Sequence, residues 1–170
     1  AAGVGALAAG IGVAAKAAAA DEKAFTQLSN TIRNVTGATH EQIKAVDDQI
    51  DVMQRATGIA DDALRPAFEA LVRGTRDIDV AMSQMNLVVD ISTSLQMDAA
   101  TVADALAKAQ QGNTKALKAL SPEMAAMIKE GAGMNEILEV LTANFEGSAA
   151  AAADTFEGRM ARLQIALDRK

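Results

Sequence analysis

The strongest constraint on the fold is a series of glycines that punctuate an otherwise helix-forming sequence. Gly37, Gly58, Gly74, Gly112 and Gly147 each follow a stretch of good helix formers. A glycine just after a helix readily adopts the left-handed conformation that ends it. The alternation of apolar and polar residues that marks a strand does not occur between them. Helices this short are marginal alone, so the sequence predicts an all-α fold of several short capped helices packed as one helical domain.

Helix-start signals accompany these glycines. Residues 39–42 (THEQ) match a capping box, Asp98 is placed to cap a helix, and Ser121-Pro122 combines a cap with a proline in the first turn. Further starts are expected at Asp61 or Asp62, Thr75, Asn113, Asn135 and Ser148. Helical spacing predicts that the inward-facing residues include Phe25, Leu28, Ile32, Ile43, Val46, Ile50, Met53, Leu64, Phe68, Leu71, Val72, Ile78, Met82, Met85, Val89, Leu95, Leu106, Leu117, Leu120, Met124, Ile137, Leu141 and Phe145.

Both ends of the chain predict longer, alanine-rich helices. We expect three regions: an apolar Ala/Gly-rich segment at residues 1–20, a multi-helix core at 21–147 and an amphipathic helix at 148–170. The chain starts inside an apolar run and stops without a helix-ending signal, so it reads as a piece of a longer protein.

The first fifteen residues carry no charge. Small residues recur four apart there, ending at Gly5, Gly10 and Gly12, and this spacing lets two helices approach closely. One interpretation is a helix that packs on another copy of the chain. The other is part of a membrane-active segment, although a membrane span needs about 20 apolar residues.

The last predicted helix carries a heptad-like seam. Phe156, Met160, Leu163 and Leu167 follow one another at steps of four, three and four, which is the spacing of a coiled-coil contact. With Gly5, Gly10 and Gly12, these residues are the candidates for self-association.

Composition limits the core and the partners. Alanine supplies nearly a quarter of the chain and the only aromatic residues are four phenylalanines, which predicts a thin core. Residues 37–153 hold nine basic and seventeen acidic groups, a net charge of −8. This surplus argues against binding to nucleic acid, which requires an excess of Lys and Arg. The chain has no cysteine, so it has neither a disulfide nor a thiolate ligand.

No pattern of residues predicts catalysis, a cofactor or a metal site. His40 is the only histidine and lies in a helix-start turn. Asp47, Asp48 and Asp51 fall on one side of a helix, and we interpret them as a solvated acidic face because no calcium-binding loop surrounds them. We interpret Asp61 and Asp62 as residues that cap the start of a helix. We therefore expect no enzyme activity.

Three segments resemble the core region of phage tail tape measure proteins. They are residues 85–94 (MNLVVDISTS), residues 105–120 (ALAKAQQGNTKALKAL) with their Gly-Asn-Thr break, and residues 149–163 (AAAAADTFEGRMARL). Their order and spacing agree with the family, and the likeness covers about residues 21–170. Residues 121–133 depart from its stricter forms.

The resemblance implies a structural virion protein. Such proteins occupy the lumen of the tail tube in several copies, set tail length and leave before DNA passes. The implied location is the virion, after assembly in the host cytoplasm. The implied partners are other copies of the chain, tail tube and tail tip proteins, tail assembly chaperones and, as a further candidate, the host membrane. The alternative function is a membrane-active helical segment that penetrates the host envelope.

A series of short capped helices does not fit a molecular ruler that measures length as one extended helix. A single straight helix of 170 residues would span about 255 Å, whereas a compact domain of this size has a radius of gyration near 15 Å. We therefore expect a packed helical domain here rather than a uniform extended rod.

Overall fold

A computed structural model of the chain describes residues 3–155, 158, 160–162 and 165, with side chains described from residue 15 onward. These residues form helices and short connections without a strand, which confirms the all-α prediction. The elements in chain order are α1 (Gly3–Thr36), α2 (His40–Thr57), α3 (Asp61–Thr75), α4 (Ile78–Leu95), α5 (Ala99–Gln110), the 3₁₀ helix η1 (Thr114–Ala119), α6 (Pro122–Glu130), α7 (Met134–Phe145) and α8 (Ser148–Ala153).

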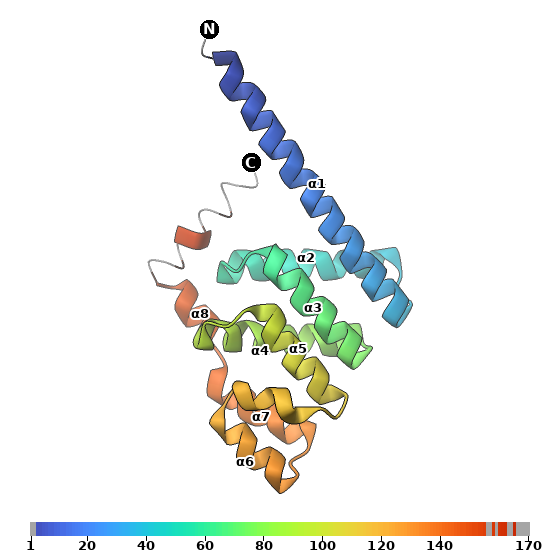
Figure 1. Ribbon diagram of the computed structural model, residues 1–170, viewed down its shortest axis with the longest axis vertical. Coiled ribbons are helices and arrows are strands. Elements are labelled where there is room, and N and C mark those ends of the chain that lie inside the picture. The colour runs from blue at the N-terminus through green and yellow to red at the C-terminus, as the bar shows by residue number, and fades with distance from the viewer. Residues whose placement is uncertain (1–2, 156–157, 159, 163–164, 166–170) are drawn as a thin grey trace.

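Helix α3 is the central element, in contact with α1, α2, α4 and α5. Figure 1 shows the chain passing from α1 and α2 at one end, through α3, α4 and α5, to α6 and α7 at the other. Helix α8 then packs on both α4 and α2, so the chain turns back toward its start. The N-terminal half of α1 extends away from this body (Figure 1).

The predicted capping chemistry is present at most of the helix ends. The hydroxyl of Thr39 accepts a hydrogen bond from the backbone N–H of Gln42, and the side chain of Gln42 accepts one from the N–H of Thr39. The Asp98 carboxylate accepts from the N–H of Thr101 at 3.0 Å. Positive φ angles occur at the expected helix-ending positions Gly37, Gly58, Gly112 and Gly147.

The prediction that Gly74 ends a helix was wrong. Helix α3 continues through Gly74 to Thr75, and Arg76 takes the left-handed conformation instead. A Cβ atom on Gly74 would lie 2.6 Å from the Cα of Ala107 in α5. Gly74 is therefore the place where the backbones of α3 and α5 approach most closely, since any side chain would collide there. Asp77, not Thr75, caps α4 by accepting from the N–H of Val80.

Several other expected helix starts are shifted. Ala60 precedes α3 and Gly133 precedes α7, both without a side-chain cap, so neither Asp61, Asp62 nor Asn135 is the capping residue. Asn113 precedes η1 but its side chain makes no capping bond. Ala60 and Gly133 have the extended backbone of a cap, so the starts of α3 and α7 lie one or two residues before the predicted polar residues.

The core is one continuous cluster that runs from α1 to α8. The predicted inward-facing residues are buried or partly buried, except Leu95, whose exposure of 36% makes that prediction wrong. Phe68 is fully buried at its centre, and alanines fill much of the remainder. Helices α3 and α5 thus pack closely because their facing residues are small, as the Gly74 contact with Ala107 shows.

Candidate functional site

The N-terminal part of α1 is an arm that leaves the packed body. Residues 15–23 are all exposed, whereas Leu28 and Ile32 further along the same helix are fully buried. We define the arm as residues 3–23, which as an α-helix extend about 30 Å. Gly5, Gly10 and Gly12 lie within this continuous helix. The surroundings of their side-chain positions are outside the described residues, so their role in self-association stays a prediction.

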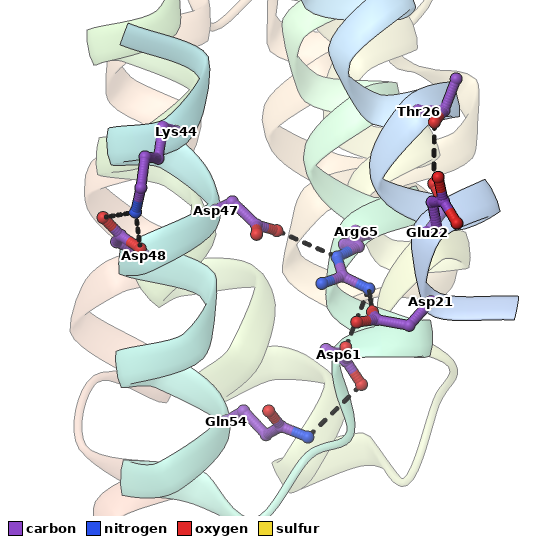
Figure 2. Close-up of polar contacts among 9 residues, drawn as sticks. All are labelled: Asp21, Glu22, Thr26, Lys44, Asp47, Asp48, Gln54, Asp61 and Arg65. Carbon is purple, nitrogen blue, oxygen red and sulfur yellow. Dashed lines mark hydrogen bonds and ion pairs between the residues drawn. The ribbon is translucent and has the colours of Figure 1, made fainter. Parts of the chain in front are cut away.

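A buried arginine lies at the root of this arm. Arg65 of α3 has only 6% of its side chain exposed and forms ion pairs with three carboxylates. Its Nη1 contacts Asp21 of α1 and, at 2.9 Å, Asp61 of α3, and its Nε donates to Asp47 of α2 at 3.1 Å. Figure 2 shows the guanidinium in the middle of the three acids. We call this group of four residues the Arg65 cluster. It joins α1, α2 and α3 at one point.

The cluster has more negative than positive charge, and this affects its titration. Burial lowers the pKa of Arg65, but its hydrogen bond to Asp21 and the charges of Asp47 and Asp61 outweigh that effect and raise the pKa above its usual value. Burial raises the pKa of Asp47, and the neighbouring Arg65 offsets this only in part. Arg65 therefore stays charged, whereas ionised Asp47 is less favourable in the fold than in water.

A cleft of about 430 Å³ opens beside the cluster, between the arm root and α2. Its walls are mixed in charge and include Phe25, His40, Lys44 and Glu22 together with members of the cluster. His40, which the sequence placed in an exposed helix-start turn, is indeed exposed at the start of α2. The cleft lies where α1 passes from the packed body into the arm.

A second polar contact ties α1 to α3 deeper in the fold. Glu69 is 3% exposed and accepts hydrogen bonds from Thr31 of α1 and from Arg73, both at 3.1 Å. Together with buried Leu28 and Ile32, this contact fixes the C-terminal half of α1. Asp21 and the C-terminal half of α1 are thus held to α3 by different interactions.

The acidic residues of α2 do not form the predicted solvated face as a group. Asp47 is partly buried against Arg65, and Asp48 pairs with Lys44 at 3.0 Å on the exposed side. Within the described part of the chain, no three histidine or acidic side chains are grouped so that they could hold a metal ion. Sequence reasoning missed the Arg65 cluster. The Asp61/Arg65 spacing of four was its one local signal.

The C-terminal helix is interrupted, contrary to the prediction of one helix from Ser148. Helix α8 ends at Ala153, followed by a turn at Asp154 and a bend at Thr155. The Thr155 hydroxyl donates to the carbonyl of Ala152 and accepts from the N–H of Gly158, which stabilises the bend. Met160 of the predicted seam is 49% exposed. Phe156, Leu163 and Leu167 lie outside the described residues, so the seam stays a prediction.

Helix α8 is capped by a residue from another helix. The Asp90 carboxylate of α4 accepts from the N–H of Gly147 at 3.2 Å and from the N–H of Ala149 at 2.8 Å. No sequence signal indicated this, because more than fifty residues separate the partners. Asp90 belongs to the first segment of the family resemblance and Ala149 to the third, so the contact brings these two segments together.

No described helix is long and apolar enough to cross a lipid bilayer. No family model matches the chain, and neither the curated proteins nor the solved structures include one that matches it.

Proposed function

We propose that the chain is a structural virion protein, a segment of a tail tape measure protein that occupies the tail tube lumen, contributes to tail length and is released at genome delivery. The observation that carries the proposal is the agreement between the family-like motifs and the interruptions of the fold. The Gly-Asn-Thr motif lies at the break between α5, which ends at Gln110, and η1, which begins at Thr114. The Asp-Thr of the third motif coincides with the bend that ends α8.

The shape of the chain also supports a structural role. An arm of about 30 Å projects from a body of short helices, and the buried core of that body is mostly aliphatic. In the proposed function the arm continues into the extended part of the ruler. The packed body forms a local domain of it.

The first test asks whether the body contributes to tail length. In a phage whose tail carries the chain, residues 37–153 are deleted in frame and tail length is measured by electron microscopy. If the 117 removed residues act as an extended helix, the tail shortens by about 175 Å. If they act as a packed domain, it shortens by about 30 Å, the size of such a domain.

Mass spectrometry of purified tails supplies the control. Peptides of the chain must be present in wild-type virions and must lack residues 37–153 in the variant. Tails of unchanged length that assemble normally would reject the ruler role of this segment. Absence of the chain from virions would reject the proposal as a whole.

One observation favours the alternative function, a membrane-active segment. Residues 3–15 of the charge-free run lie in the arm, away from the packed body. The discriminating measurement is leakage of dye from anionic liposomes by the whole chain and by a variant lacking residues 1–20. A complete loss of leakage in the variant supports membrane activity of the run, and equal leakage excludes it as the agent.

A further inference from the structure

Within the arm, Asp21 links α1 to the body through its ion pair with Arg65. Residues 15–20 on its N-terminal side are exposed. Four residues beyond Asp21, Phe25 is partly buried against the core, and burial is complete from Leu28. Asp21 is itself 63% exposed and reaches back to Arg65. The partly exposed side chain of Asp21 therefore links the arm to the buried side chain of Arg65.

The ties on the two sides of Arg65 differ in strength. Asp47 and Asp61 are largely shielded, with 23% and 26% of their side chains exposed. A partly exposed ion pair such as Asp21–Arg65 contributes little to stability, whereas a buried charge that loses its last partner is strongly destabilising. If the ion pair between Asp21 and Arg65 breaks, Arg65 remains paired with the carboxylates of Asp47 and Asp61. The contact with α1 can therefore break without leaving the buried charge of Arg65 unpaired.

The docked part of α1 limits where the arm can move. Leu28 and Ile32 are fully buried. Thr31 donates to Glu69, so the C-terminal half of α1 stays on the body. The arm and the docked half form one continuous helix, so a change in the direction of the arm is a bend between Asp21 and Leu28. Asp21 lies about two turns before Leu28, on the arm side of that bend.

We propose that Asp21 and Arg65 form a releasable clasp that fixes the direction of the α1 arm. While it is closed, the arm projects at one angle from the body. When it opens, the arm changes direction and the body stays folded because Arg65 remains neutralised by Asp47 and Asp61. The inference rests on the geometry of the cluster and holds whether or not the chain belongs to a phage tail.

The charged and ionisable side chains that surround the pair from the three helices are Glu22 on α1, His40, Lys44, Asp47 and Asp51 on α2, and Asp61 on α3. The acids outnumber the bases, so Arg65 lies in surroundings of net negative charge.

The experiment measures the arm angle with a pair of spin labels. The chain has no cysteine, so Ala17→Cys on the arm and Gln49→Cys on α2, both at exposed positions, give two unique labelling sites. At neutral pH the clasp predicts one narrow distance between the labels. Asp21→Asn is expected to abolish the single narrow distance and to leave the helix content unchanged by circular dichroism.

Glu22→Gln is the matched control. It removes a carboxylate from the adjacent position, where no ion pair to Arg65 forms, and it should keep the narrow distance. Arg65→Met is the second variant and should broaden the distance as Asp21→Asn does. A narrow distance retained in Asp21→Asn would overturn the clasp, and so would equal broadening in Asp21→Asn and Glu22→Gln.

Discussion

Helix α3 makes two close contacts that differ in kind. At Gly74 it touches α5 through backbone and methyl groups, and any added atom would collide with Ala107. At Arg65 it touches α1 through charges, one of which is largely exposed. A steric contact between small residues cannot loosen unless the helices separate, whereas an exposed ion pair can break and re-form. The α3–α5 contact therefore holds the fold, whereas in our proposal the Asp21–Arg65 pair sets the direction of the arm.

The largest expected effect on stability comes from a substitution in the buried face of α3. Phe68 lies on α3 and is fully buried, so Phe68→Ala should lower the free energy of unfolding by about 3–5 kcal/mol through lost burial and a cavity. The measurement is urea unfolding followed by circular dichroism. Phe25→Ala at the arm root removes the same ring from a partly buried position and should cost clearly less. Equal losses would show that α1 at Phe25 is packed as firmly as α3 at Phe68.

Gly74→Ala tests the steric contact itself. The new methyl group would have to displace the Ala107 backbone, and such overpacking costs about 1–3 kcal/mol. Gly133→Ala is the control because no atom lies within 4 Å of its Cβ position, and the loss of a glycine before α7 should cost less than about 1 kcal/mol. If Gly74→Ala were neutral or stabilising, the close approach of α3 and α5 would be contradicted.

Removing the hydrogen bonds between Asp90 and the start of α8 is expected to have an intermediate effect on stability. Asp90→Ala removes both hydrogen bonds to the start of α8, and the loss of a helix cap costs about 0.5–2 kcal/mol. Amide hydrogen exchange should rise within α8 and remain unchanged in α2. Asp104→Ala, which removes an exposed pair with Lys108, is the control and should change stability by less than about 0.5 kcal/mol. Unaltered exchange in α8 would refute the cap.

The smallest effect is on the pH dependence of the Arg65 cluster. Burial raises the folded-state pKa of Asp47, so the stability that this group contributes is present below its ordinary pKa and is lost as the pH rises through the raised value. Relative to Asp47→Asn, the wild type should therefore gain stability as the pH falls from 7 toward 4. Urea midpoints of the two proteins at both pH values provide the measurement. A relative loss in that range would mean that Arg65 outweighs the burial.

Local chemistry made much of the fold predictable. The capping box at Thr39 and Gln42 and the left-handed glycines act within four residues, so their meaning does not depend on the rest of the chain. Gly74 shows the limit, because a glycine serves both as a helix end and as a place of close approach. Only the position of α5 decides between the two, and that position follows from packing.

The candidate site was less predictable for the same reason. Arg65 meets Asp21 and Asp47 across 44 and 18 residues, and Asp90 meets α8 across more than 50. The one local signal, the spacing of Asp61 and Arg65, is common on exposed helices. The interruption of the last helix was also unpredictable, since Thr155 stabilises the bend through contacts that a continuous helix could replace.

Amide hydrogen exchange along α1 tests the account most directly. The structure predicts a step within a single helix, with fast exchange at residues 15–20 and slow exchange at residues 28–36, where Leu28 and Ile32 are buried. A helix without packing partners is marginal, so the arm should be far less protected than the docked half. Uniform slow exchange throughout α1 would contradict the account, because the arm would then be packed as firmly as the body.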